Sequence, residues 1–578
     1  MLKRLASYLR GYEKYVAGSP LLVIVETVCQ LIIPLLMAQI INEGILKEDM
    51  APIWRAGALM VVVALAATIT GAAAAKCATN AAQGLGANLR RAEFERVASF
   101  SFADIDRFSS SSLITRMTND VTNIQNTAMI CLRILIRAVT MLIASVVLTL
   151  SINPRLALVV LVILPIMAAA LMALMKICFP LFEKMQKALD HLNEQVQENL
   201  IAVRVVKSYV REDREREKFI DANDGFTAAG LRAVLRMVAM QPVMMICMSA
   251  ATVLVLYFGG QMVLGLEMDL GYLQTVLDYI MQILMSIMMV GMAILQLTRA
   301  QASIHRVFEV IDAQSSVTDG DEQRLPSPQG RVEFRDVSFR YQTGGAGEDV
   351  LRHINLDIRP GEFVAIVGGT GTGKSSLVNL IPRFYDVHKG KVLVDGLDVR
   401  DYPLDGLRGR IGMVLQSNVL FSGTIRENLL WGNENATEEE LIQAAKDAQA
   451  YDFIMSFPEG FDTYLEQGGV NVSGGQKQRL CIARAMVRKP SVLILDDSTS
   501  AVDSATEGRI RESFRENLKG TTVIIIAQRI SSVQYADKIV VLDDGTVTGV
   551  GTHDELMKTN RIYREIYDSQ QEGGGTNE

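Results

Sequence analysis

The sequence FVAIVGGTGTGKS, at residues 363–375, joins a strand pattern directly to a glycine-rich loop. The five apolar residues Phe363–Val367 predict a buried strand. The loop has the GxxxxGK[ST] spacing in the strand–loop–helix setting of a phosphate-binding loop. The residues that we expect to contact phosphate are Gly368, Gly369, Thr370, Gly371, Thr372, Gly373, Lys374, Ser375 and Ser376.

The residue types of this loop indicate a site for ATP and Mg²⁺. The glycines let backbone N–H groups surround the phosphates, and the following helix adds its dipole. Lys374 brings positive charge to the β- and γ-phosphates, and the Ser375 hydroxyl is a ligand for Mg²⁺. A second apolar strand, Val492–Leu495, ends in Asp496, whose carboxylate we expect to be a second partner of Mg²⁺.

Between these two motifs lies a second candidate anion site. It begins a helix and consists of Ser473, Gly474, Gly475 and Gln476. A single nucleotide does not need two such anion sites from one chain. We therefore expect this stretch to face the γ-phosphate of ATP bound to another subunit.

The chain of 578 residues has two halves of different composition. Over the whole chain, 49% of the residues are hydrophobic and the mean hydropathy is +0.22. The net charge is −7, and the sequence contains no block of like charges, which argues against a nucleic-acid partner. Six cysteines are scattered without CxxC spacing, so neither a zinc site nor a disulfide framework is expected.

The N-terminal half contains six apolar runs of spanning length. They lie near 19–41, 56–76, 131–152, 155–178, 238–264 and 271–298. The basic N-terminus and the even number of spans predict that both termini are cytoplasmic. The polar connections 77–130 and 179–237 keep helical periodicity, so we expect stalks that reach roughly 35 Å beyond the membrane.

Ionisable residues inside spans are candidates for function. Glu26 and Asp278 are the clearest, and each could contact a substrate. Alternatively, Glu26 pairs within the helix bundle and Asp278 lies near the outer interface. About a dozen of the 27 methionines fall between Met237 and Met292, which suits either an adaptable apolar binding surface or ordinary packing.

A composition change divides the chain. Residues 1–310 form the membrane part, and 311–330 are a polar linker containing proline and glycine. An α/β domain is expected over 331–570, beginning with the alternating strand Val332–Phe339, and 571–578 are expected to be a disordered tail.

Residues 331 to about 570 resemble the nucleotide-binding domain of ATP-binding-cassette (ABC) transporters, and the whole chain resembles an exporter half-transporter. The resemblance implies a six-helix all-α transmembrane domain with long cytoplasmic extensions, followed by an α/β P-loop domain. It implies that Tyr341 stacks on adenine and that Gln416 is the Q-loop glutamine, which touches Mg²⁺. The D-loop would be Ser500–Asp503, with Asp503 at the dimer seam, and the coupling helices would lie near 103–110 and 202–209.

Two positions depart from this family. Its catalytic glutamate is replaced by Asp497, and its switch histidine is replaced by Gln528. Aspartate withdraws the carboxylate by roughly 1.5 Å, and a misplacement of about 1 Å can cost on the order of 10²-fold in rate. Glutamine cannot carry a positive charge. Together these changes predict a site that binds ATP and hydrolyses it weakly.

The signature 473–476 is nevertheless intact. This combination suggests a heterodimer in which a different half-transporter supplies the glutamate and the histidine. Gln467 stands where many exporters have a glutamate, and agrees with this interpretation. The expected cargo is an amphipathic or apolar drug, lipid or peptide, moved across a cell membrane that we expect to be a bacterial plasma membrane. A slow homodimeric exporter, an ATP-gated channel or regulator, and an importer are the alternatives.

Overall fold

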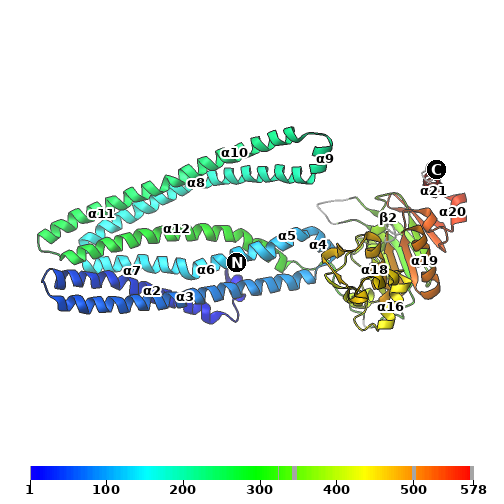
Figure 1. Ribbon diagram of the computed structural model, residues 1–578, viewed down its shortest axis with the longest axis horizontal. Helices are drawn as coiled ribbons and strands as arrows, with labels where there is room; N and C mark the ends of the chain where they lie inside the picture. The colour runs from blue at the N-terminus through cyan, green and yellow to red at the C-terminus, as the bar shows by residue number, and fades with distance from the viewer. Residues whose placement is uncertain (1, 323, 342–347, 498–502, 573–578) are drawn as a thin grey trace. The chain divides into compact units, whose positions relative to one another are not determined.

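The computed structural model describes residues 2–322, 324–341, 348–497 and 503–572. The chain divides into two compact units, of which the first comprises Met1–Arg96 with Leu113–Asp312 and the second comprises Val97–Ser112 with Ala313–Glu578. The first unit is all-α and the second is α/β (Figure 1). The predicted fold class is therefore confirmed.

Long helices dominate the chain up to Asp312. They are α1 (Leu2–Ser7), α2 (Glu13–Gln39), α3 (Met50–Ala98), α4 (Phe102–Phe108), α5 (Ser110–Thr115), α6 (Val121–Ile130), α7 (Ile136–Ile152), α8 (Pro154–Ile201), α9 (Val203–Ser208), α10 (Glu212–Val238), α11 (Met240–Leu264) and α12 (Leu270–Asp312). Three π-helical turns, Ile40–Ile45, Arg116–Asp120 and Cys131–Leu135, continue neighbouring helices.

Five helical stretches among the described residues are long and apolar enough to cross a membrane: Glu13–Ile45, Met50–Ala98, Ser110–Ile152, Met245–Leu264 and Leu270–Asp312. Each of them contains or largely overlaps one of the predicted spans. The remaining predicted span, 155–178, lies in α8, where the described apolar stretch Pro154–Ile166 is shorter.

The helices α8 and α10 form the longer of the predicted polar extensions. They lie side by side and are joined by the short helix α9 (Figure 1). The helix α8 begins where the sequence requires it to begin, because the Asn153 side chain accepts hydrogen bonds from the N–H groups of Arg155 and Leu156, and Pro154 occupies the first turn.

Among its described residues, the second unit contains three sheets. The central sheet has the order β12-β11-β3-β10-β9-β6, a four-stranded sheet has the order β2-β1-β4-β5, and β7 pairs with β8. The strands are β1 (Val332–Phe339), β2 (Leu351–Ile358), β3 (Phe363–Val367), β4 (Lys389–Val394), β5 (Leu397–Asp398), β6 (Ile411–Val414), β7 (Gly423–Thr424), β8 (Tyr464–Leu465), β9 (Val492–Asp496), β10 (Thr522–Ile526), β11 (Lys538–Asp543) and β12 (Thr546–Gly551).

An apolar core lies on each face of the central sheet, and the four-stranded sheet supplies many residues of one of these cores. Helices supply further residues of both cores. They are α13 (Lys374–Asn379), α14 (Leu404–Arg408), α15 (Ile425–Leu430), α16 (Glu438–Asp447), α17 (Tyr451–Ser456), α18 (Gly474–Val487), α19 (Ser504–Asn517), α20 (His553–Thr559) and α21 (Arg561–Glu572). The strands β3 and β9 are buried along their whole length, as their continuous apolar runs predict.

The first strand differs from its prediction. Residues Val332–Phe339 form β1, but their burial does not alternate, because only Arg335 and Asp336 are exposed in the middle of the strand. The register shifts there against both neighbouring strands, and Asp336 has a φ of 49°. A β-bulge therefore breaks the period of two, and residues on either side of it point into the core.

Candidate functional site

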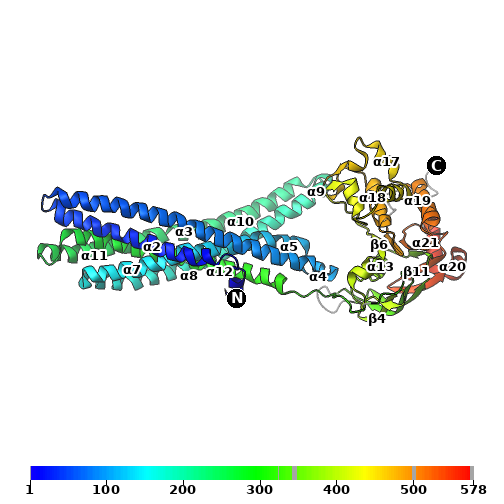
Figure 2. The ribbon, with the colours of Figure 1, turned by 90° about the horizontal axis from the view of Figure 1, so that it is seen from below.

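The parallel strands of the central sheet bring the candidate residues to one edge. The strand β3 pairs with β10, β10 pairs with β9, and β9 pairs with β6, all in parallel. Their carboxyl ends therefore meet, and ligands of open α/β sheets bind at such an edge. The glycine-rich loop follows β3, Gln528 follows β10, Asp497 follows β9 at its last residue Asp496, and Gln416 follows β6. Figure 2 labels β6 and α13, the helix that follows the glycine-rich loop.

The glycine-rich loop has the backbone geometry that its sequence predicts. Gly371 and Gly373 have φ values of 82° and 94°, which side chains with a Cβ rarely adopt. A Cβ on Gly373 would also lie 2.8 Å from the Leu351 side chain. The tip of the loop, Gly369–Gly371, is exposed, and Thr372 Oγ1 donates to the Gly369 carbonyl at 3.0 Å.

Lys374 is held within its own loop. Its Nζ donates to the Gly368 and Gly369 carbonyls at 2.9 and 2.5 Å. Burial lowers the pKa of its ammonium group, while the nearby Asp496 and Asp497 carboxylates raise it. The ammonium is therefore placed between the loop and the two carboxylates, where an incoming phosphate would replace the carbonyl partners.

Ser375 and Asp496 form an oxygen pair suited to a hard divalent cation. The Ser375 hydroxyl donates to Asp496 Oδ1 at 2.9 Å, and the Asp496 side chain is only 4% exposed. Burial raises the pKa of Asp496, and the neighbouring Asp497 raises it further. A desolvated carboxylate next to a hydroxyl fits Mg²⁺, which prefers oxygen ligands.

Asp497 and Gln528 are in direct contact. Gln528 Nε2 donates to Asp497 Oδ2 at 2.6 Å. Asp497 has a φ of 47°, a conformation found in turns and at functional sites. Burial raises the pKa of this carboxyl group, whereas the bond from Gln528 lowers it. The two residues that depart from the family pattern therefore bond to each other beside Lys374.

Tyr341 lies beside the loop helix in an aromatic cluster. Its hydroxyl shares a 2.8 Å hydrogen bond with Ser376, and its ring makes edge contacts with Phe339 and Tyr385 at centroid distances of 4.9 and 5.1 Å. Burial raises the pKa of the Tyr341 hydroxyl. The position is close to the glycine-rich loop, and its adenine contact stays a prediction.

The remaining predicted residues, Gln416, Gln467 and Asp503, are exposed. Gln416 is exposed beyond β6. Asp503 caps α19 by accepting a 2.9 Å hydrogen bond from the Thr506 N–H, and Ser500, Ala501 and Val502 lie outside the described residues. Gln467 is exposed in a short 3₁₀ turn.

The signature stretch is a capped helix start on the surface. Ser473 Oγ accepts from the Gln476 N–H at 3.3 Å, and the Ser473 N–H donates to Gln476 Oε1 at 2.9 Å. Ser473 and Gly474 are exposed, and α18 begins at Gly474. The first N–H groups of this helix have no partner within the helix and are available to an anion.

Two contacts of the second unit were missed by sequence reasoning. Phe102, at the start of α4, stacks on Phe384 at a centroid distance of 4.2 Å, and the Tyr385 hydroxyl donates to Asp106 at 2.8 Å. Short helices thus occur at both predicted coupling stretches, and the first packs on residues that follow α13. The adjacent aromatic pair Phe384-Tyr385, in a polar surface segment, was the signal available in the sequence.

Comparison with known proteins explains this arrangement. Residues 16–287 match the family model of the ABC transporter transmembrane region, and residues 351–500 match that of the ABC transporter ATP-binding domain, described as ABC transporter. An uncharacterized ABC transporter ATP-binding protein, YfiB of Bacillus subtilis, is 38% identical over 98% of both chains. The chain belongs to the ABC exporters. A membrane domain and an ATP-binding domain in one chain therefore imply ATPase-coupled transport.

Two further relatives extend the similarity. The putative multidrug export ATP-binding/permease protein YgaD of Bacillus subtilis is 35% identical over 84% of this exporter and 83% of its own chain. A solved structure of a bacterial Atm1-family ABC exporter with ATP bound has a TM-score of 0.81 and 25% identity, and covers 96% of this chain and 99% of its own.

Proposed function

We propose that this exporter chain is one subunit of a heterodimer, with a degenerate ATP site of its own and a signature that completes the site of a different partner. The bond between Asp497 and Gln528 carries the proposal. The carboxylate at the position of the catalytic base is one methylene short and accepts a strong hydrogen bond from an amide. Neither property suits a general base, which has to reach and deprotonate a water molecule.

The degenerate site still has the groups that bind nucleotide. The N–H groups of the glycine-rich loop and Lys374 hold the phosphates, and Tyr341 stacks on the base. Ser375, Asp496 and Gln416 would hold Mg²⁺, which would supply positive charge to offset that of the phosphates. Asp497 orients water poorly, and Gln528 contributes a neutral amide where a histidine could become positively charged.

The intact signature acts on the partner's nucleotide. Ser473 and Gly474 present a hydroxyl group and backbone N–H groups at the start of α18, and both residues are exposed. Such donors stabilise the charge that spreads over the equatorial oxygens during phosphoryl transfer. Asp503 contributes at the seam between the two subunits.

The transported compound is amphipathic or apolar and leaves the cytoplasm or the inner leaflet. The large apolar surface of the helices and the similarity to a multidrug export protein support this class. Both termini lie in the cytoplasm, because the basic residues of the N-terminus precede the first span. The membrane is a bacterial plasma membrane, a placement that the similarity to bacterial exporters supports.

The test combines composition with activity. The tagged chain is purified from its native membrane in mild detergent and, separately, after expression alone. We expect the native complex to contain a second half-transporter and to hydrolyse ATP. The chain alone should bind ATP, lose this binding in Lys374→Ala, and hydrolyse ATP at least tenfold more slowly than the complex. Rapid hydrolysis by the isolated chain would contradict the proposal.

A further inference from the structure

Two carboxylates, Glu26 and Asp278, lie within the predicted apolar spans, and their hydrogen-bond and charge partners differ. Glu26, on α2, is 5% exposed, and its Oε1 accepts a hydrogen bond from Arg137 on α7 at 3.1 Å. Arg137 also donates to Gln30 at 2.9 Å. The expectation that Glu26 pairs within the bundle is therefore confirmed, and its charge has a counter-ion within the chain.

Among the described residues, Asp278 has no such counter-ion. Its one hydrogen-bond partner among the described residues is Gln274, one turn earlier on α12, at 3.5 Å, and no ion pair involves it in that part of the chain. A carboxylate in an apolar span is costly without a cation or a polar cavity. Lipid tails supply neither, so a plain lipid-facing position is a poor explanation for this residue.

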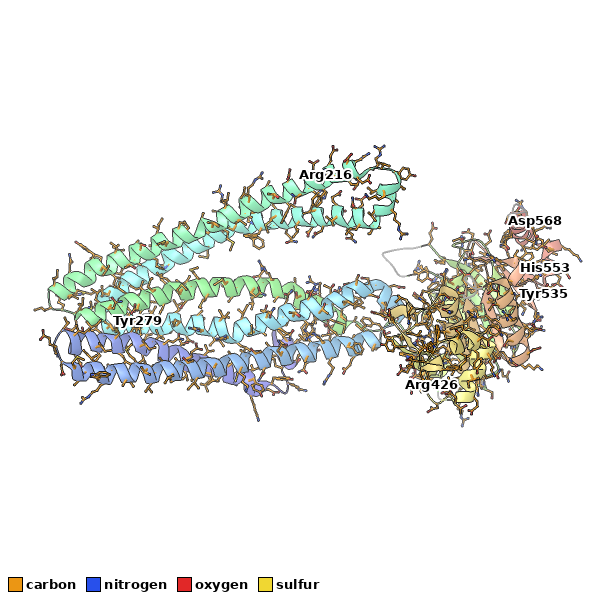
Figure 3. All side chains as sticks on the ribbon, viewed as in Figure 1. Arg216, Tyr279, Arg426, Tyr535, His553 and Asp568 are labelled. Carbon is orange, nitrogen blue, oxygen red and sulfur yellow. The ribbon has the colours of Figure 1, made fainter. Side chains whose placement is uncertain are left out.

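The other faces of α12 are occupied. The Thr275 hydroxyl donates to the Pro34 carbonyl at 2.9 Å, and the Tyr279 hydroxyl donates to the Leu31 carbonyl at 2.7 Å, which fixes one face against α2. Figure 3 labels Tyr279 on α12. Val276 and Ile283 belong to an apolar core with residues of α8 and α11. In the part of the chain that the structure describes, these contacts leave a third face of α12 whose side chains are exposed or partly exposed.

This third face combines the carboxylate with methionines. Positions 274, 278, 281, 285 and 292 recur at spacings of four, three, four and seven residues, which place them on one side of a helix. Met281, Met285 and Met292 are 41, 55 and 61% exposed. At 1.5 Å per residue, Met285 and Met292 lie about 10 and 21 Å along the axis from Asp278.

We propose that this face of α12 binds the transported compound and that the compound is a lipophilic cation. The Asp278 carboxylate attracts the positive group, and Gln274 positions the carboxylate. The methionine side chains, which are flexible and polarisable, pack against an apolar body that extends along the helix. This substrate class rests on the proposed export function and adds a charge requirement to it.

The probe is tetraphenylphosphonium, a permanent lipophilic cation, and triphenylphosphine oxide is its neutral counterpart. Binding of each is measured on the full-length chain in lipid nanodiscs without nucleotide. We expect wild type to bind the cation at least tenfold more tightly than the neutral compound. Asp278→Asn should weaken cation binding at least tenfold, about 1.4 kcal/mol, and change neutral binding less than twofold.

Matched variants separate charge from packing. Asp269→Asn removes an exposed carboxylate just before α12 and should leave both affinities unchanged. Asp278→Glu should keep the preference for the cation, and Met285→Ala should weaken both ligands alike. Nucleotide is absent from this binding experiment, so a negative result here does not contradict the proposed asymmetry of the ATP sites. A negative result in the ATPase experiments likewise does not contradict binding of the cation at Asp278.

Three results would overturn the inference. The first is that the wild-type chain shows no preference for the cation over the neutral compound. This result does not depend on whether any variant folds. The second is an equal loss of both ligands in Asp278→Asn, which would indicate packing alone. The third is an unchanged preference for the cation in Asp278→Asn, which would mean that the charge of this carboxylate does not contribute to binding.

Discussion

Gln528 and Asp497 are joined by a 2.6 Å hydrogen bond from the glutamine amide to the aspartate carboxylate, although 31 residues separate them in sequence. The bond forms because β10 and β9 are parallel neighbours in which Ile526 pairs with Asp496. The residues just after these two strand positions therefore meet beside the glycine-rich loop. In this exporter the contact joins the two positions at which the catalytic base and the switch residue are expected.

Restoring both residues should restore hydrolysis. We expect the isolated chain with Asp497→Glu and Gln528→His to hydrolyse ATP at least tenfold faster than wild type, because two copies then provide complete sites and intact signatures. A positioned general base contributes about 10²–10⁴-fold. The measurement is steady-state phosphate release at saturating Mg·ATP. The control, Asp497→Gln with Gln528→His, lacks the carboxylate and should stay slow, and an equally fast control would contradict this explanation.

The stack of Phe102 on Phe384 predicts a coupling defect. Phe102→Ala removes a ring contact worth about 0.5–1.5 kcal/mol. We expect stimulation of ATPase activity by a transported compound to fall about threefold to tenfold, while the ATP dissociation constant changes less than twofold. The matched control is Phe94→Ala, which truncates an exposed ring on α3. Equal effects of the two variants would show that the stack has no special role.

The ion pair between Arg137 and Glu26 predicts a stability effect in the membrane unit. Arg137→Ala leaves the Glu26 carboxylate buried without a cation, and we expect a loss of about 3 kcal/mol. Thermal unfolding in detergent measures this as a lower midpoint. The double variant Glu26→Gln with Arg137→Gln keeps polar contacts without charge and should unfold close to wild type. If Arg137→Ala is as stable as wild type, the ion pair does not stabilise the membrane unit.

Sequence patterns predicted the elements and motifs of this exporter better than the contacts between them. The run Phe363–Val367 is the strand β3, and the apolar run ending in Asp496 is β9, because continuous apolar runs and glycine spacing are local signals. The bulge at Asp336 was missed, since an extra residue in a strand has no clear local signature.

Contacts between distant segments needed the structure. The pair Glu26 and Arg137 is separated by 111 residues, and Tyr385 and Asp106 by 279. Each side chain looks ordinary in its own segment, and only helix packing or the chain path brings the partners together. The exposed face around Asp278 is similar, because its methionines become meaningful only once the other faces of α12 are seen to be occupied.

The most direct test of the asymmetric heterodimer compares Gly474→Asp with Asp497→Asn in the complex purified from its native membrane. The added carboxylate at Gly474 repels the partner's γ-phosphate and blocks close approach of the backbone. We expect Gly474→Asp to lower steady-state ATPase activity at least 50-fold, about 2.3 kcal/mol, with ATP still bound at Lys374. Asp497→Asn should change the same rate less than about threefold, about 0.65 kcal/mol. Equal losses from both variants, or activity of Gly474→Asp within about twofold of wild type, about 0.4 kcal/mol, would contradict the heterodimer proposal.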